Sequence, residues 1–338
     1  MRAALLPRYG SPLELTEIPT PEPGPGEVLV RVAAAGVCHS DVHLRRHEAN
    51  ELPEFPWILG HEVAGHVERL GPGPAVVEPG DAVAVFGGFG CGACEVCLGG
   101  DEQLCSSGRW LGIGRPGGYA EHVLVPSARH LVPLGALDPV DAAPLTDAAL
   151  TPYRAIRKVL PALRPGSSTV VIGAGGLGQC AVQLLRLLSA TEVVVLETAP
   201  DKRDAAISLG AHHALDPADA DVVEHVRSLT GGGATAVLDI VGAEETTALA
   251  AQLARRRGCV VLVGLAGGTV PVGFAAVAPE VNVTTSFWGN RTELAEVVRL
   301  AQRGALRVGV TRYPFESLED AFDDLVGGRV RGRAVVTF

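Results

Sequence analysis

A glycine-rich turn that joins an apolar strand to an apolar helix constrains the fold of this chain more than any other feature. Residues Thr169–Ile172 are mostly β-branched, residues Gln179–Leu188 fit an almost wholly apolar helix, and glycine occupies positions 173, 175, 176 and 178 between them. A strand that turns tightly into a helix brings backbone N–H groups to the helix N-terminus, where they attract the pyrophosphate of a dinucleotide. The sequence therefore predicts a dinucleotide-binding turn with cofactor contacts from Gly173, Gly175, Gly176, Leu177 and Gly178.

The alternation of strand and helix continues along the chain. Apolar runs predict further strands over residues 193–196, 236–240, 260–263 and 281–284, and helical segments lie near 202–209, 222–229 and 244–257. Continuous apolar strands separated by helices are typical of a parallel sheet covered on both faces. From about residue 150 onward, the sequence predicts a doubly wound α/β domain.

Glu197 ends the strand that follows the glycine-rich turn, 19 residues after Gly178. A carboxylate at this point accepts hydrogen bonds from the adenosine ribose and repels a 2′-phosphate, which favours NAD over NADP. Lys202 and Arg203 are close enough in sequence to reach the same ribose, and they weaken this preference.

The first 150 residues show a different pattern, of short strands separated by turns rich in proline and glycine. β-rich runs cover Glu27–Ala33, Val63–Leu70 and Asp81–Val85, a spacing typical of all-β barrels. The last segment contains an amphipathic helix around Leu294–Ala301 and a closing strand, Arg333–Phe338. A lone strand cannot satisfy its own backbone, so we expect it to pair with the first domain or with the end of the second.

Four closely spaced cysteines form the most specific motif in the sequence: Cys91, Cys94, Cys97 and Cys105. Two-residue gaps let thiolates converge on one ion, and four of them complete a tetrahedral shell with no open position, which predicts a structural Zn²⁺. Unrelated thiols are a weak alternative at this spacing. An iron–sulfur cluster is a better one, although the gap before Cys105 fits neither common ferredoxin spacing.

A third group of candidate residues is dispersed. Cys38–His43 follows a strand, and Gly60–Glu62 precedes another. Taken alone, Cys38 or His61 is more often a core thiol or a hydrogen-bonded core imidazole than a metal ligand. Spacing by itself does not identify a site here.

Composition excludes several classes of protein. The chain has 338 residues, 47% of them hydrophobic, which fits an ordered chain of two domains. A net charge of −10 argues against nucleic acid as a partner, and no apolar run is long enough to cross a membrane. The apolar stretch at the start is too short for a signal peptide, so we expect a cytoplasmic location, where seven cysteines favour metal chemistry over disulfides.

Together these features closely resemble the zinc-dependent alcohol dehydrogenases of the medium-chain dehydrogenase/reductase superfamily, over essentially the whole chain. The resemblance is carried by Gly36–His43, Gly60–Gly65, the four cysteines, Asp147 to Tyr153, and Gly173–Gly178. It implies a β-rich GroES-like catalytic domain over residues 1–149 and 289–338, with a structural zinc lobe at 91–105. It also implies a Rossmann NAD-binding domain over residues 150–288.

The resemblance implies two zinc ions per chain, one structural and one catalytic. Cys38 and His61 match the first two ligands of the catalytic zinc, and Asp147 matches the third, as in a group of bacterial enzymes that oxidise secondary alcohols. Three protein ligands leave a fourth position for substrate. Glu62 matches an acidic neighbour of the metal, and Asp41 matches the residue that orients His61.

The resemblance further implies a proton relay and a cofactor groove. Zinc would polarise the alcohol oxygen while hydride passes to the nicotinamide; Ser40 matches the hydroxyl that takes the alcohol proton, and His43 the imidazole that passes it to solvent. Cofactor contacts are implied for His39 and Arg333 at the pyrophosphate and for Val241, Val263 and Leu265 beside the nicotinamide. Candidate walls of an apolar substrate pocket, each of which can equally be a core residue, are Leu44, Trp57, Trp110, Phe287 and Trp288.

The leading hypothesis is an NAD-dependent, zinc-dependent alcohol dehydrogenase that acts on small or medium alcohols, secondary alcohols first. A polyol or sugar-alcohol dehydrogenase is an alternative, and the charged stretch Arg45–Glu48 is either a solvated rim or a sign of a polar substrate. A non-catalytic, zinc-stapled binding protein is a second alternative. Relatives are dimers or tetramers, so we expect a homo-oligomer, with a tetramer favoured, and a small molecule as the other partner.

Overall fold

A computed structural model describes residues 1–48 and 51–338. The chain divides into two compact units, which are called here the β-rich unit, Met1–Leu150 with Gly289–Phe338, and the parallel-sheet unit, Thr151–Trp288. Among the described residues, none of the helices combines the length and apolar character that crossing a membrane requires.

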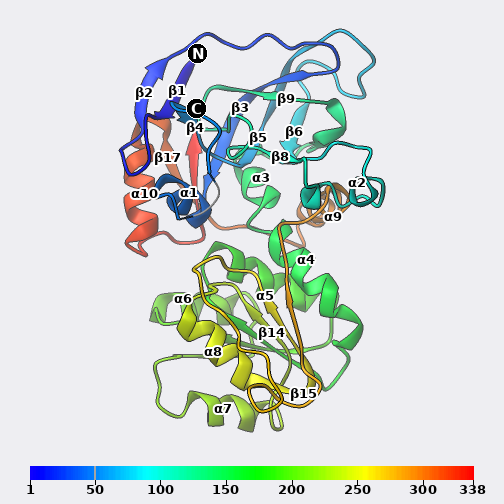
Figure 1. The fold of residues 1–338 in the computed structure, drawn as a ribbon, viewed down its shortest axis with the longest axis vertical. Helices are drawn as coiled ribbons and strands as arrows, with labels where there is room; N and C mark the ends of the chain where they lie inside the picture. The colour runs from blue at the N-terminus through cyan, green and yellow to red at the C-terminus, as the bar shows by residue number, and fades with distance from the viewer. Residues whose placement is uncertain (49–50) are drawn as a thin grey trace. The chain divides into compact units, whose positions relative to one another are not determined.

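The main sheet of the β-rich unit joins strands from both ends of the chain (Figure 1). Its strands run in the order β10-β6-β5-β3-β18-β17, and β9 also pairs with β3. The closing strand is confirmed, and it pairs within this unit, antiparallel to β3, with Ala334 opposite Val37. The bounds are β3 Val28–Val37, β5 Glu62–Leu70, β6 Ala82–Val85, β9 His122–Val125, β10 Leu131–Pro133, β17 Val310–Pro314 and β18 Arg333–Thr337.

Smaller elements surround this sheet. A second sheet has the order β2-β1-β4, and two short strands, β7 and β8, form a third. Sequence analysis missed β17 and helix α10, which precede the closing strand. The bounds are β1 Arg2–Leu6, β2 Glu14–Glu17, β4 Trp57–Ile58, β7 Gly88–Phe89, β8 Arg109–Trp110, α1 His39–Arg45, α2 Glu95–Leu98, α3 Pro139–Ala142, α9 Arg291–Gln302 and α10 Leu318–Val326.

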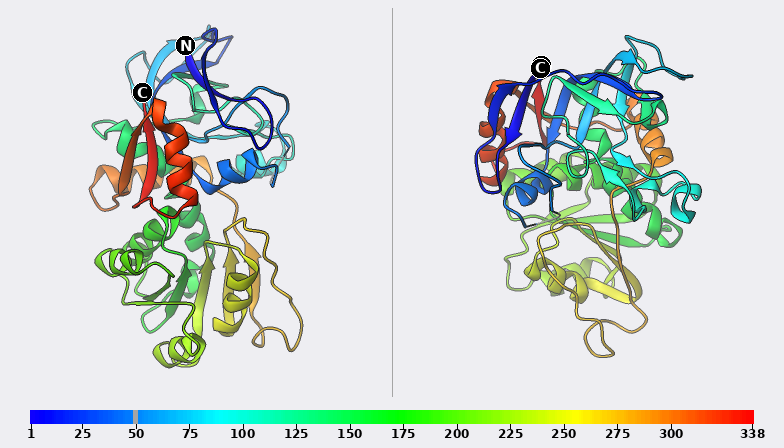
Figure 2. Two further views of the ribbon diagram at one scale, coloured as in Figure 1. Left: turned by 90° about the vertical axis from the view of Figure 1, so that its left-hand side faces the viewer. Right: turned by 45° about the horizontal axis from the view of Figure 1, so that its top comes forward.

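The parallel-sheet unit confirms the predicted doubly wound fold. Its six strands are all parallel, in the order β13-β12-β11-β14-β15-β16, and helices lie on both faces (Figures 1 and 2). The strand order reverses beside β11, which is where ligands bind in open α/β sheets. The bounds are α4 Leu150–Val159, β11 Ser168–Ile172, α5 Gly176–Leu188, β12 Glu192–Leu196, α6 Pro200–Ser208, β13 His213–Leu215, α7 Val222–Leu229, β14 Ala234–Asp239, α8 Glu244–Leu253, β15 Ala254–Leu262 and β16 Asn282–Thr285.

One predicted helix extends too far. The helix expected over residues 244–257 ends at Leu253, and β15 begins at Ala254, which pairs with Ala234 on β14. Residues 255–257 are three arginines, good helix formers, yet they lie exposed in the strand. They fall in an irregular stretch between the pairs Ala234–Ala254 and Ala236–Cys259, so the strand contacts on either side of them have overridden local helix propensity.

Candidate functional site

Three side chains that are far apart in the sequence meet inside the β-rich unit. Cys38 follows β3 and caps the start of α1, His61 directly precedes β5, and Asp147 follows the 3₁₀ turn Ala143–Thr146. Together with Glu62 they are buried, and one ligand atom from each lies within 4.8 Å of the others. The structure therefore brings together the three residues that the resemblance implies for the catalytic zinc.

The donor set and its spacing fit a zinc ion. Asp147 Oδ2 lies 3.6 Å from Cys38 Sγ and 3.7 Å from His61 Nε2. Zinc bonds of about 2.0–2.3 Å to sulfur, nitrogen and oxygen separate tetrahedral ligands by roughly 3.3–3.8 Å. His61 Nδ1 lies 3.2 Å from the Asp41 carboxylate, which fixes the tautomer that turns the Nε2 lone pair toward the other ligands.

Arg333 forms an ion pair with Glu62, the fourth residue of the cluster. Its guanidinium donates to both carboxylate oxygens of Glu62, and its Nη2 donates to Asp147 Oδ2 at 3.1 Å. Burial raises the pKa of Glu62 to about 8, although the Arg333 charge opposes this shift. The Arg333 side chain is 4% exposed, and its guanidinium donates to these two carboxylates. Its contact with the cofactor pyrophosphate stays a prediction.

Helix α1 carries the two residues of the predicted proton relay. Ser40 and His43 are three residues apart and half-buried, so they lie on the same side of the helix. Ser40 Oγ is 3.5 Å from Cys38 Sγ, and His43 Nδ1 is 3.0 Å from the carboxylate of Glu48. His39, at the first position of α1, is exposed.

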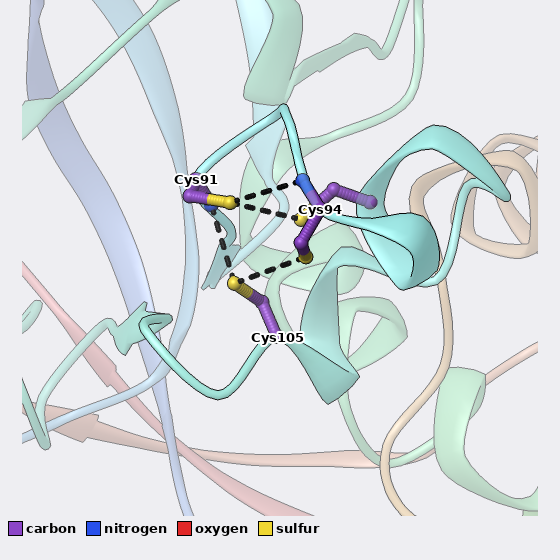
Figure 3. Close-up of side chains that lie close together, drawn as sticks. Cys91, Cys94 and Cys105 are labelled. Atoms are coloured by element: carbon purple, nitrogen blue, oxygen red, sulfur yellow. Dashed lines mark hydrogen bonds between the residues drawn. The ribbon is translucent and has the colours of Figure 1, made fainter.

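The four predicted cysteines converge in a separate loop, and Figure 3 shows three of them, Cys91, Cys94 and Cys105. Sγ of Cys91 and Sγ of Cys97 are 3.9 Å apart, and Sγ of Cys94 and Sγ of Cys105 are 3.7 Å apart. Zn–S bonds of about 2.3 Å in a tetrahedron place the sulfurs roughly 3.8 Å apart. The donor set and its spacing therefore fit a closed zinc site.

Two of these thiols have opposite environments. Backbone N–H groups of Ala93 and Cys94 donate to the sulfur of Cys91 and lower its pKa to about 6. Burial, together with the neighbouring thiols, raises the pKa of Cys97 to about 12. A divalent cation is what would let all four sulfurs ionise together.

The glycine-rich turn has the shape of a phosphate cradle. A Cβ on Gly178 would collide with the backbone oxygen of Gly173, so glycine is required where the helix approaches the strand. A Cβ on Gly175 would meet nothing within 4 Å, which leaves the backbone there open to a ligand. Glu197 lies beside this turn, because its Oε2 accepts from the Ala174 N–H at 2.7 Å.

The remaining predicted contacts have mixed surroundings. Leu44 and Trp57 lie in the main hydrophobic core of the β-rich unit, and the Trp57 indole N–H donates to the Gly112 carbonyl at 3.0 Å. Their roles as pocket walls, like the cofactor contact of the half-buried Lys202, stay predictions. In the parallel-sheet unit Val241, Leu265 and Phe287 are exposed, whereas Val263 and Trp288 are buried. The Trp110 indole N–H donates to the carbonyl of Gln103 at 3.2 Å.

One contributor to the site was missed by sequence reasoning. Tyr119 is fully buried, and its hydroxyl donates to Asp41 at 2.8 Å. Its place directly after Gly117 and Gly118 was the only sequence signal, and it marks a turn rather than a contact with the site.

Comparison with known proteins finds relatives along nearly the whole chain. Residues 24–136 match the family model described as Alcohol dehydrogenase GroES-like domain, and residues 176–303 match the one described as Zinc-binding dehydrogenase. The NAD-dependent alcohol dehydrogenase of Sulfurisphaera tokodaii is 38% identical over 99% of this chain and 99% of its own. The D-arabinose 1-dehydrogenase (NADP(+)) of Saccharolobus solfataricus is 36% identical over 99% of this chain and 97% of its own. The crystal structure of the alcohol dehydrogenase from Aeropyrum pernix matches with a TM-score of 0.93 at 35% identity and covers 100% of both chains.

Proposed function

This chain belongs to the zinc-dependent alcohol dehydrogenases of the medium-chain dehydrogenase/reductase superfamily, and from that membership we propose its substrates and the roles of its residues. It is an NAD-dependent oxidoreductase that interconverts alcohols with ketones or aldehydes. We propose that it prefers small or medium secondary alcohols. The observation that carries this proposal is the buried group Cys38, His61 and Asp147, in which a carboxylate takes the third ligand position.

The metal ligands and the residues of helix α1 have different roles in the proposed reaction. Cys38, His61 and Asp147 would hold the ion and leave one position open for a substrate oxygen. Zinc bound there supplies a Lewis acid for that oxygen. The Ser40 hydroxyl takes the alcohol proton, and the His43 imidazole passes it to solvent. Glu48 supports this last step, because its carboxylate lies 3.0 Å from His43 Nδ1 and favours the tautomer with an unprotonated Nε2.

Two alternatives from the sequence are less favoured. A polyol or sugar substrate is supported only by the D-arabinose dehydrogenase among the relatives described above. A non-catalytic binding protein would have no need for the buried ligand group, the relay residues and the cofactor turn together. The charged stretch beside α1 fits a solvated rim, since Arg46 and Glu48 are exposed.

Assembly and location belong to the same proposal. Strand β16 is at the edge of its sheet, and exposed Val272 and Phe274 lie in the segment that leads into it. Unprotected sheet edges and exposed apolar side chains favour contact with another chain. They support a homo-oligomer, and among homo-oligomers we propose a tetramer. None of the seven cysteines, all of which the structure describes, is in a disulfide, as a cytoplasmic, reducing compartment favours.

A substrate panel with one matched pair of variants tests the proposal. NADH absorbance across primary, secondary and benzylic alcohols, polyols and D-arabinose should give the highest kcat/KM with a secondary alcohol. Asp147→Ala should abolish turnover and reduce zinc from about two ions per chain to about one. Asp141→Ala, which changes an exposed carboxylate paired with Arg312, should alter neither. A preference for polyols or sugars, or full activity of Asp147→Ala, would contradict the proposal.

A further inference from the structure

One buried carboxylate, that of Asp41, ties together the segments that carry two of the metal ligands. Its Oδ2 accepts from the backbone N–H of Cys38 at 3.0 Å, and its Oδ1 accepts from the Gly60 N–H at 3.3 Å and from His61 Nδ1 at 3.2 Å. Asp41 is fully buried. The spacing between the thiolate ligand and the imidazole ligand therefore depends on how firmly this carboxylate is held.

Tyr119 supplies the shortest hydrogen bond to that carboxylate. Its hydroxyl lies 2.8 Å from Asp41 Oδ2 and 3.2 Å from the Gly36 carbonyl, and the charged acceptor at the shorter distance takes the proton. Without this donor, Oδ2 would keep a single partner at a position that water does not reach, which is costly for a buried anion.

The ring of Tyr119 holds the backbone beside His61. Gly60 has a φ of +96°, and a Cβ at this position would lie 2.8 Å from the Tyr119 ring. The Tyr119 N–H donates to the Leu59 carbonyl at 3.0 Å. Both parts of the Tyr119 side chain therefore act on His61. The ring packs against the backbone beside it, and the hydroxyl acts on its imidazole through Asp41.

We propose that Tyr119 is a positioning residue of the catalytic metal site, whose hydroxyl sets the orientation of His61 through Asp41. This inference rests on the proposed function, because it takes His61 as a zinc ligand. Residues that hydrogen-bond directly to a metal ligand, as Asp41 does, change metal affinity by about 10–100-fold when they are lost. Tyr119 acts on His61 through Asp41, so its loss is expected at the lower end of that range, about tenfold, with the fold retained.

The test compares two variants that each remove one tyrosine hydroxyl. Tyr119→Phe keeps the ring that packs on Gly60. Tyr313→Phe is the matched control, because the Tyr313 hydroxyl also donates to a carboxylate, Asp324, at 2.8 Å, outside the ligand group. Competition with a chromophoric chelator at pH 7.5 should show the catalytic site of Tyr119→Phe binding zinc about tenfold more weakly, and that of Tyr313→Phe unchanged. Co²⁺ loaded into the catalytic site should give an altered visible spectrum only in Tyr119→Phe.

A double-mutant cycle tests whether the effect passes through Asp41. Asp41→Asn should weaken zinc binding by itself, and adding Tyr119→Phe to it should weaken binding by much less than in the wild-type background. Additive effects would overturn the proposal, as would a Tyr119→Phe variant that binds zinc and Co²⁺ like the control. If Tyr119→Phe fails to fold while Tyr313→Phe folds, the hydroxyl serves the whole unit and the proposal is rejected.

These outcomes are distinguishable from failure of the proposed function. Zinc affinity and the Co²⁺ spectrum are measured without turnover. A wild-type protein that binds zinc but oxidises none of the alcohols would remove the proposed function, while the comparison of the two tyrosine variants would still decide the role of Tyr119.

Discussion

At the scale of single residues, Glu197 serves the fold and is also placed to serve a ligand. Its Oε2 accepts from the Ala174 N–H at 2.7 Å and its Oε1 from the Ala199 N–H at 3.0 Å. Each carboxylate oxygen can accept a second hydrogen bond. Oε1 already has its second donor, because it also accepts from the Thr198 hydroxyl at 3.2 Å. Oε2 therefore retains a position for a ribose hydroxyl, beside a turn whose backbone is open to a pyrophosphate.

Glu197→Ala should increase the use of NADP relative to NAD. The carboxylate repels a 2′-phosphate, so its removal is expected to raise the ratio of kcat/KM for NADP to that for NAD by roughly tenfold, about 1.4 kcal/mol. Steady-state kinetics with both cofactors measures this ratio. Glu192→Ala changes a carboxylate at the other end of the same strand, paired with His213, and should leave the ratio alone. An unaltered ratio in Glu197→Ala would mean that another group reads the ribose.

How much of the site the sequence predicts depends on the kind of contact. Cys38, His61 and Asp147 were predicted from a resemblance carried by local motifs, and the structure places them together. The contribution of Tyr119 could not be predicted, because its contact with Asp41 spans 78 residues and has no fixed spacing. The pairing of Arg333 with Glu62 spans 271 residues, and only the strand pairing of β18 with β3 creates it.

At the scale of elements, the four-cysteine loop has little apolar packing of its own. Its one α-helix, α2, has four residues, and Leu98 and Leu104 within the loop are exposed. Within the loop, the contacts that remain are those of backbone N–H groups and thiols with the four sulfur atoms. We therefore expect the loop to depend on its metal.

Cys94→Ser should release one zinc ion per chain and lower the Tm by roughly 5–10 °C, because the metal contributes folding free energy. Metal analysis and calorimetry measure the two effects. Cys259→Ser changes a half-buried thiol outside both metal groups and should keep about two zinc ions. Wild-type stability of Cys94→Ser would count against a structural ion.

His130 should make the β-rich unit sensitive to acid. Burial, reinforced by the Arg129 charge, lowers the pKa of His130 to about 4, below its ordinary 6.5. Between these pH values the unfolded chain binds more protons than the folded one, so stability is full above about pH 6.5 and falls as the pH drops toward 4. The shift corresponds to about 3 kcal/mol in total, of which about 2 kcal/mol is lost by pH 5.

The variant His130→Gln removes the imidazole that takes up a proton and keeps a polar side chain of similar size. Urea unfolding at pH 7 and pH 5 in excess zinc should show a smaller loss of stability for His130→Gln than for the wild type. His225→Gln, at an exposed position of α7, should lose as much as the wild type. Equal losses in all three proteins would show that His130 does not carry the acid sensitivity.

Helices and strands were predicted correctly where apolar residues form long, regular runs. The prediction failed where contacts with other strands determine the structure. The strands and helices around the glycine-rich turn were predicted from apolar runs, which are long and regular there. β13 has only three residues, all half-buried at a sheet edge, so it leaves no apolar run to detect. The end of α8 was misplaced because three arginines favour helix locally, whereas they form the irregular stretch between two paired positions of β15, Ala254 and Cys259.

At the scale of the whole molecule, the parallel sheet has two edges that differ in length. The edge strand β13 has three residues, and the other edge strand, β16, has four, of which Val283 and Thr284 are half-buried. Phe274, in the segment before β16, is fully exposed, and Val272 is 69% exposed. Exposed apolar side chains and an open sheet edge are both features expected of a contact between chains.

Phe274→Asp should therefore shift the proposed homo-oligomer toward smaller species. A carboxylate at the contact would be desolvated without a partner, which opposes association. Sedimentation velocity over a range of protein concentrations measures the distribution. Val76→Asp places the same charge at a second exposed apolar position, 87% exposed in the β-rich unit, and should leave the distribution unchanged. If both variants sediment like the wild type, Phe274 is not part of a contact between chains.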